Sequence, residues 1–190
     1  MMQKSNHVIL GSQSPRRFEI LADAGFDIKV VKPTIEERYP FTMDYYKVPE
    51  YISKLKIFDV YSYLSDDSNI IICADTMVLF DKKLVGKPKN ADHAFKILKA
   101  LNGKPHDVVT GVSMRKNKKQ ISFSEQTKVR FKELTDDEIR NYIEQFQPFD
   151  KAGSYNIQEY IGIDYIVGEY QNVMGLPIKR VLQEMKILHK

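Results

Sequence analysis

An acidic residue, Asp75, stands inside the most apolar run of the sequence, residues 70–80 (IIICADTMVLF). A run of this length and composition predicts a strand that is buried on both faces. A carboxylate inside such a strand raises the free energy of the fold unless it is paired, hydrogen-bonded or bound to a metal. Asp75 is therefore a candidate catalytic residue. Two alternatives compete with this role: a position at a strand end that faces water, or a cap on a neighbouring loop.

A lysine, Lys87, follows this strand in the Gly-Lys-Pro tripeptide of residues 86–88. Just beyond it, Asn90 suits the N-cap of a helix that should run to about residue 102, with Gly103 past its end. A helix N-terminus attracts anions through its free N–H groups and its dipole. An acid on a buried strand and a lysine at a helix start therefore suit an anionic ligand that is bridged by a divalent metal.

A second candidate for anion binding lies near the N-terminus. Residues 7–10 should form a short strand that runs into a loop of small polar residues and then into a helix over 15–24, with Ser14 as its N-cap. This arrangement offers a phosphate free N–H groups, the helix dipole and two cations, Arg16 and Arg17. The alternative, two surface arginines on a first helical turn, fits the residues slightly better when they are taken alone. The Walker P-loop pattern is absent.

The rest of the chain alternates between strand and helix patterns. Strands are predicted over residues 26–31, 108–114 and 120–131 and over the two arms of a tight hairpin, 164–167 and 170–173; helices are predicted over 48–64, 135–146 and 177–188. Glu37 lies just beyond the strand of residues 26–31, where ligand-binding loops lie in α/β sheets, although a solvated acidic loop is the better interpretation of this position alone. Without strict βαβ regularity, the pattern predicts a mixed sheet with helices on both sides.

Length and charge limit the class of protein. The 190 residues suffice for a single domain, 1–190, with one or two lobes. The net charge of +4 suits a small phosphate-bearing partner and is too weak to indicate nucleic acid. No apolar run approaches the about 20 residues of a membrane span. The first residues lack the apolar stretch of a signal peptide, which predicts a cytoplasmic protein.

The single cysteine, Cys73, excludes an intramolecular disulfide and a cysteine metal cluster. It falls in the apolar run of residues 70–80, where a free cysteine acts as a small hydrophobe, and no basic residue adjoins it that would make it a nucleophile. The basic cluster of residues 115–119 is typical of a solvated hairpin turn.

Five blocks of the sequence together resemble the Maf family of nucleotide pyrophosphatases: LGSQSPRRFEIL, ICADTMVLF, GKPKNADHAFKILKALNGKPHDVVTGV, FDKAGSYNIQ and NVMGLPI. They occur in the family's order over nearly the whole chain. The resemblance implies an elongated α/β fold, a mixed β-sheet flanked by helices with two lobes around a central cleft, akin to the inosine triphosphate pyrophosphatases. It also implies a homodimer with a house-cleaning role that hydrolyses a nucleoside triphosphate to the monophosphate and pyrophosphate with a divalent metal, Mg²⁺ or Mn²⁺.

The resemblance also assigns roles to individual residues. Asp75 matches the proposed catalytic base, and Glu37 matches an acid after the second strand that is a candidate metal ligand together with Asp75. Substrate-binding residues matched in the family's motifs are Ser12, Arg16, Arg17, Lys56, Thr76, Lys87, Lys151 and Gln158. The match of Lys56 is the loosest, because it requires Ile52-Ser53 to stand for the family's Leu-Ala.

Three of these positions, Arg16, Thr76 and Gln158, divide the family, and the residues here resemble those of the branch that acts on dTTP and UTP. One position departs from the family: Glu159 stands where glycine is usual, and its carboxylate could pull the preference towards CTP. Thr76 should point to the strand face opposite Asp75, so the strand should end or bulge at Thr76 if both are to reach the cleft.

Two other function classes remain as alternatives. The first is a nucleotide-binding regulator of cell division that has lost turnover, against which the intact Asp75, Lys87 and Lys151 argue. The second is a nucleic-acid-binding module, which the mild charge and the lack of a basic-aromatic platform disfavour.

Overall fold

The computed structural model describes residues 7–64 and 69–188. These residues form two compact units. The first holds the chain up to Thr76, residues 110–125 and the chain from Gly175 onwards; the second holds residues 77–109 and 126–174. Two units agree with the two lobes implied by the resemblance, whereas the central cleft and the single domain over 1–190 stay predictions.

The strands form one seven-stranded sheet with the order β2-β1-β3-β5-β6-β7, in which β4 pairs with β3. They are β1 (His7–Gly11), β2 (Asp27–Val30), β3 (Ile70–Phe80), β4 (Lys83–Val85), β5 (Pro105–Lys116), β6 (Lys119–Phe131) and β7 (Ile163–Val167). β1 is parallel to both β2 and β3, while β4 is antiparallel to β3 and β7 is antiparallel to β6. The predicted mixed sheet is confirmed.

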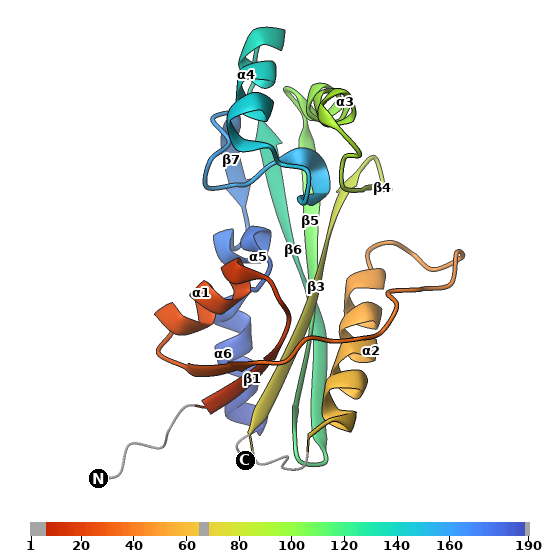
Figure 1. Cartoon of the computed structure of the whole chain (residues 1–190), viewed down its shortest axis with the longest axis vertical. Coiled ribbons are helices and arrows are strands. Elements are labelled where there is room, and N and C mark those ends of the chain that lie inside the picture. Colours follow the sequence, from red (N-terminus) through yellow and green to blue (C-terminus); the bar gives the residue numbers. More distant parts are fainter. Residues whose placement is uncertain (1–6, 65–68, 189–190) are drawn as a thin grey trace. The chain divides into compact units, whose positions relative to one another are not determined.

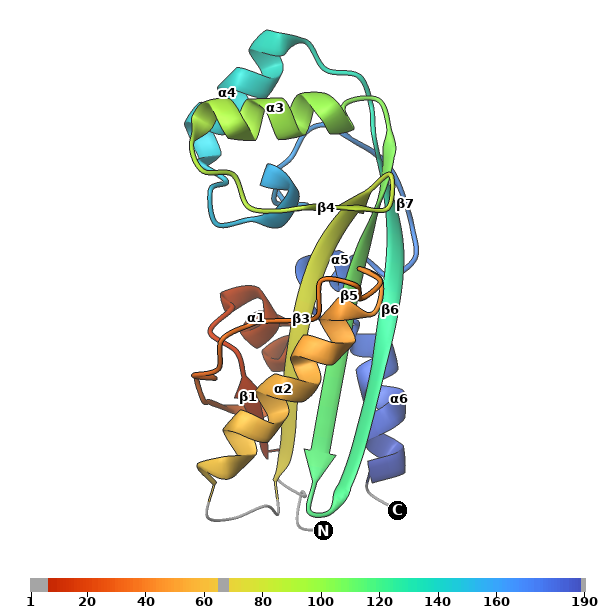
Figure 2. The ribbon, with the colours of Figure 1, turned by 90° about the vertical axis from the view of Figure 1, so that its right-hand side faces the viewer.

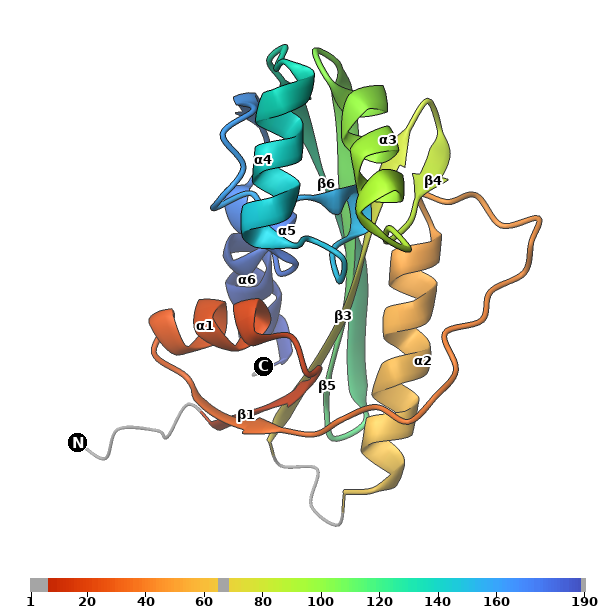
Figure 3. The ribbon, with the colours of Figure 1, turned by 45° about the horizontal axis from the view of Figure 1, so that its top comes forward.

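The helices are α1 (Pro15–Asp23), α2 (Val48–Ser62), α3 (Ala91–Leu101), α4 (Asp136–Phe146), the short 3₁₀ helix η1 (Ala152–Ser154), α5 (Tyr170–Met174) and α6 (Ile178–Leu188). In the first unit, α2 lies on one side of β3, and α1 and α6 lie on the other (Figure 1, Figure 3). In the second unit, α3 and α4 lie side by side (Figure 2). Helices therefore flank the sheet, as predicted. None of the described helices combines the length and apolar character needed to cross a membrane.

Local hydrogen bonds explain where two of these helices begin. The side chain of Asn90 accepts the N–H of His93 at the start of α3, and Thr135 and Glu138 form a reciprocal capping box at the start of α4. Both caps were expected from the sequence. Ser14 precedes α1 as predicted, but its side chain does not cap the helix. Instead, the N–H of Ser14 donates to Oγ of Ser12 at 3.2 Å.

The predicted hairpin at residues 164–173 is wrong. Its first arm is β7, but β7 pairs with β6, and the second arm is the helix α5. The chain turns at Gly168 with a φ of 127°, and Thr127 Oγ1 then both donates to the carbonyl of Glu169 and accepts its N–H, at 3.1 Å each. The buried amide of Asn172 donates to the Val108 carbonyl and to Thr127. These long-range bonds satisfy the backbone groups of Glu169 and the side-chain amide N–H groups of Asn172.

The core of the first unit explains two features of its sequence. Cys73 belongs to a buried apolar cluster with Ile9, Ile57, Val60 and Ile71. Burial raises the pKa of the Cys73 thiol to about 12, so the residue acts as a small hydrophobe and not as a nucleophile. Gly111 lets α2 approach β5, because a Cβ at this position would lie 2.0 Å from the backbone nitrogen of Glu50.

The core of the second unit is built around a buried histidine. His106 is 2% exposed, and its ring packs edge-on against Phe131 and Tyr155. The His106 Nε2 atom lies 2.9 Å from the hydroxyl of Tyr155. Burial lowers the pKa of His106 to about 4, so the folded protein keeps this imidazole neutral at pH 7.

This burial predicts a stability that falls in mild acid. The unfolded chain protonates His106 near pH 6.5 and the folded chain only near pH 4, so its contribution is complete above pH 6.5 and is lost as the pH falls towards 4. The difference corresponds to about 3 kcal/mol. His106→Asn removes the titratable group. The difference in unfolding free energy between wild type and variant, measured in urea, should therefore be about 3 kcal/mol smaller at pH 4 than at pH 7. An equal gap at both pH values would contradict the assignment.

Candidate functional site

The buried acid of the sequence, Asp75, pairs with a buried lysine from a different element. Asp75 lies on β3 and is 8% exposed, and the strand around it is buried, as predicted. Its Oδ1 atom accepts a hydrogen bond from Nζ of Lys56 at 2.8 Å. Lys56 lies on α2 and is itself buried. Lys56, whose match to a family motif is the loosest, is therefore the direct partner of Asp75, the best candidate for the catalytic residue.

Lys56 also joins a second carboxylate to this group. Its Nζ atom lies 2.7 Å from Oε1 of Glu37, which is largely exposed. The loop that carries Glu37 is attached to α2 by Asp59, whose carboxylate accepts the N–H of Thr34 at 2.6 Å and its hydroxyl at 3.0 Å. The structure thus brings together three of the predicted site residues, two acids around one ammonium.

The carboxylates of Glu37 and Asp75 set what kind of metal site is possible. Among residues 7–64 and 69–188, no group of three or more His, Cys, Asp or Glu side chains is placed to hold a metal. Two carboxylate oxygen donors suit Mg²⁺ or Mn²⁺, and Mg²⁺ is commonly bound by one or two carboxylates together with substrate phosphates. The residues therefore fit a metal that is shared with a phosphate ligand, and they do not form a complete protein cage.

On the face of β3 opposite Lys56, Arg17 of α1 connects three other predicted or motif positions. Its Nη1 atom donates to Oγ of Ser12 at 3.0 Å, Nη2 to Oγ1 of Thr76 at 3.1 Å, and Nε to the carbonyl of Gly175 at 2.8 Å. Gly175 has a φ of 114°, which favours glycine. Burial lowers the pKa of Arg17, and Asp75 acts in the opposite direction. Three donors of Arg17 thus hold protein groups, while phosphate binding by Arg17 stays a prediction.

Thr76 corrects one expectation about β3. The strand was expected to end or bulge at Thr76, but β3 continues to Phe80. Asp75 contacts α2 and Thr76 contacts α1, so the two side chains lie on opposite faces of the strand, as the alternation of a strand requires. Beside Arg17, the half-buried Arg16 lies in the first turn of α1.

In the second unit, the loops that carry Lys87 and Lys151 are neighbours. The N–H of Gly153 donates to the carbonyl of Gly86 at 3.3 Å, so the two loops are linked one or two residues from each lysine. Lys87 is exposed. Lys151 is partly buried, and its Nζ atom contacts Asp150 at 2.6 and 2.7 Å.

The segment after Lys151 carries the remaining predicted residue. Asn156 is anchored to α4, since its N–H donates to the hydroxyl of Tyr142 at 2.9 Å. Gln158 is exposed, and its N–H donates to the side-chain carbonyl of Asn156 at 3.3 Å. The neighbouring Glu159 is exposed as well. Both side chains are thus available to a ligand.

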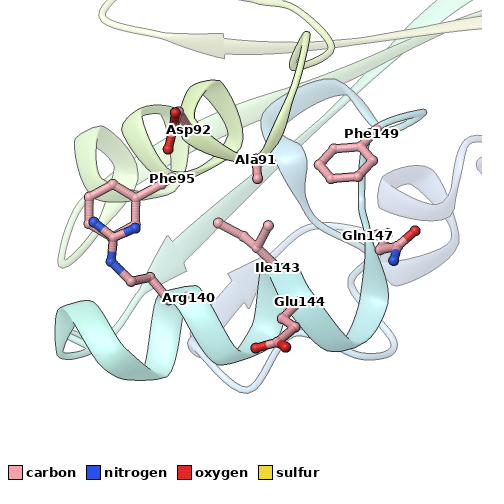
Figure 4. Close-up of a pocket in the computed structure, with 8 residues that line it drawn as sticks. All are labelled: Ala91, Asp92, Phe95, Arg140, Ile143, Glu144, Gln147 and Phe149. Atoms are coloured by element: carbon pink, nitrogen blue, oxygen red, sulfur yellow. The ribbon is translucent and has the colours of Figure 1, made fainter.

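A pocket of about 300 Å³ lies in the second unit, between α3 and α4 (Figure 4). In it, the guanidinium of Arg140 stacks over the ring of Phe95 at 4.1 Å. The lining residues are Ala91, Asp92, Phe95, Arg140, Ile143, Glu144, Gln147 and Phe149. None of the predicted site residues lines this pocket, so it is not the candidate site.

Sequence reasoning assigned no role to four residues that organise the candidate site in the first unit: Thr34, Asp59, Thr110 and Gly175. Their partners are 25, 34 and 158 positions away in the sequence, so spacing could not reveal them. One signal was present: Thr110 puts a hydroxyl into the run VVTGV, where a buried polar group needs a partner.

A family model described as "Maf-like protein" matches residues 7–188. The dTTP/UTP pyrophosphatase of Phocaeicola vulgatus is 45% identical over 186 residues, which cover 95% of each chain. The dTTP/UTP pyrophosphatase of Bacteroides thetaiotaomicron is 41% identical over 185 residues, with 95% of each chain covered. That of Porphyromonas gingivalis strain W83 is 42% identical over 189 residues, 96% of this chain and 94% of the relative. A solved Ham1 protein of Staphylococcus aureus covers 97% of this chain and 100% of its own at 12% identity and a TM-score of 0.48, a likeness too distant to bear on the fold.

Proposed function

Because the chain belongs to the Maf-like family, we propose that it is a nucleoside triphosphate pyrophosphatase that hydrolyses dTTP and UTP. The observation that carries the proposal is the pairing of Asp75 and Glu37 with the buried Lys56. It supplies a fixed carboxylate, a second acid and a cation, which are the groups that hydrolysis of a highly charged anhydride requires. The names of the relatives support the choice of substrate.

In the proposed reaction, water attacks the α-phosphorus, and the bond from this phosphorus to the bridging oxygen of the β-phosphate breaks. Asp75 is the general base. Lys56 donates to its Oδ1 atom, so Oδ2 is the oxygen that would take the proton of the attacking water. The ammonium of Lys56 also holds the carboxylate in one orientation. The products are the nucleoside monophosphate and pyrophosphate.

Charge neutralisation is the second requirement of this reaction. Glu37 and Asp75 would hold a divalent metal, Mg²⁺ or Mn²⁺, together with substrate oxygens. Such an ion supplies Lewis-acid stabilisation of the charge on the phosphates. The residues that we assign to the phosphate chain are four cations and a hydroxyl: Ser12, Arg16, Arg17, Lys87 and Lys151. The N-terminus of α1 adds N–H groups and its dipole.

Base selection is assigned to Thr76 and Gln158, with Arg16 helping to close the pocket. A site that pairs with the polar edge of a pyrimidine rejects a base that leaves its groups unpaired. The half-buried hydroxyl of Thr76 and the exposed amide of Gln158 suit this task. Glu159 adds an acceptor beside Gln158, which favours the amino group of CTP. We also propose that the protein is a cytoplasmic homodimer. Sedimentation tests whether two copies of the chain assemble.

A panel of nucleotides tests the proposal. Pyrophosphate release should be fastest with dTTP and UTP, intermediate with CTP and slow with ATP, GTP and 7-methyl-GTP, measured as kcat/KM through a coupled inorganic pyrophosphatase. With chelator in place of Mg²⁺ or Mn²⁺, the same panel should show no hydrolysis when the nucleoside monophosphate is measured directly by chromatography, because the coupling enzyme itself needs a metal. A higher kcat/KM for GTP or 7-methyl-GTP than for both dTTP and UTP would reject the pyrimidine assignment. Binding without release from any nucleotide would favour a non-catalytic regulator.

A further inference from the structure

A buried threonine, Thr110, adds a group to the site, and the family resemblance assigned no role to it. Thr110 lies on β5, is 0% exposed and has its Oγ1 atom 2.9 Å from Oγ1 of Thr76. Valine has the same shape as threonine and would fill this apolar position without a hydroxyl to satisfy. A buried hydroxyl costs free energy unless it is bonded, and the contact with Thr76 is one bond that satisfies it.

The contacts of Thr76 restrict what its hydroxyl can do. A guanidinium has donors only, so Arg17 Nη2 donates and Thr76 Oγ1 accepts, at 3.1 Å. The remaining lone pair and the hydrogen of Thr76 are then shared between Thr110 and any ligand. If Thr76 donates to Thr110, it offers a ligand an acceptor; if it accepts from Thr110, it offers a donor. In each case, Thr110 decides which hydrogen-bonding group the half-buried Thr76 presents.

We propose that Thr110 is a positioning residue for base recognition, which acts by fixing the direction of the Thr76 hydroxyl. Uracil and thymine present an N–H and a carbonyl where cytosine presents an unprotonated ring nitrogen and an amino group. A hydroxyl held in one direction pairs with one of these edges and leaves the other unsatisfied. The inference rests on the proposed function in one respect, the contact of Thr76 with the base.

Two variants of Thr110 test this role. Thr110→Val keeps the shape and removes the hydroxyl, whereas Thr110→Ser keeps the hydroxyl. The readouts are the UTP-to-CTP ratio of kcat/KM and the ratio of dissociation constants for the α,β-methylene analogues of UTP and CTP, which bind without hydrolysis. Thr110→Val should lower both ratios by about three- to tenfold, the value of one neutral hydrogen bond. Thr110→Ser should keep both ratios within about twofold of wild type.

A matched control separates this role from a loss of stability. Thr127 is another fully buried threonine with a bonded hydroxyl, on β6 in the second unit. Thr127→Val should lower the melting temperature without changing either ratio. An unchanged ratio in Thr110→Val, an equal loss in Thr110→Ser, or equal binding of the two analogues by wild type would overturn the inference. A further outcome is that the wild type hydrolyses none of the nucleotides while Thr110→Val still lowers the ratio of dissociation constants. That result would support the positioning role of Thr110 and reject the proposed activity.

Discussion

Asp75→Asn should lower kcat for the best substrate by roughly 10²–10⁴-fold, the usual contribution of a general base. Asparagine has the shape of aspartate and can still accept a hydrogen bond from Lys56, which donates to Asp75 at 2.8 Å in the wild type. It cannot take a proton from water. The loss should therefore appear in kcat, measured as pyrophosphate release at saturating dTTP or UTP.

Asp164→Asn is the matched control for this experiment. Asp164 also pairs with a cation, Arg130 at 3.3 Å, but on the partly exposed surface of the second unit. Its loss should leave kcat unchanged. An Asp75→Asn protein that folds normally and retains more than about a tenth of the wild-type rate would exclude Asp75 as the base.

Lys56→Met should strongly destabilise the first unit. The side chains of Lys56 and Asp75 are 8% and 12% exposed, so removal of the ammonium leaves a buried carboxylate without its partner. Breaking a buried ion pair in this way costs about 3 kcal/mol. Glu37, whose side chain is 56% exposed, regains water and should contribute little. The free energy of unfolding in urea measures the loss.

A double-mutant cycle identifies the cause of that loss. When Asp75→Asn is added to Lys56→Met, the uncompensated charge disappears, so the double variant should be more stable than Lys56→Met by about 1 kcal/mol or more. Additive losses from the two substitutions would show that Lys56 stabilises the fold by packing of its methylene groups and not by pairing with Asp75.

Local patterns predicted most of the secondary structure. The run of residues 70–80 predicted the bounds of β3, and the capping box at Thr135 predicted those of α4. The side chain of Asn90 caps α3 as expected. In each case, the signal lies within one element, because caps and hydrophobic periodicity are properties of neighbours in the chain. The prediction of a hairpin at residues 164–173 was wrong because hydrogen bonds of this segment run to Thr127, some 40 residues away in sequence.

The sequence by itself determined that Asp75 is a buried acid, which residues match the family, and which loops carry Lys87 and Lys151. Only the tertiary structure decided that Lys56 is the partner of Asp75. It also decided that Arg17 donates to the protein groups around Thr76. The physical reason is that the pattern of a strand indicates that a polar group is buried. It does not indicate which other group forms a hydrogen bond or an ion pair with it. That choice depends on the face of β3 against which α1 and α2 pack, and packing is made by residues far apart in the chain.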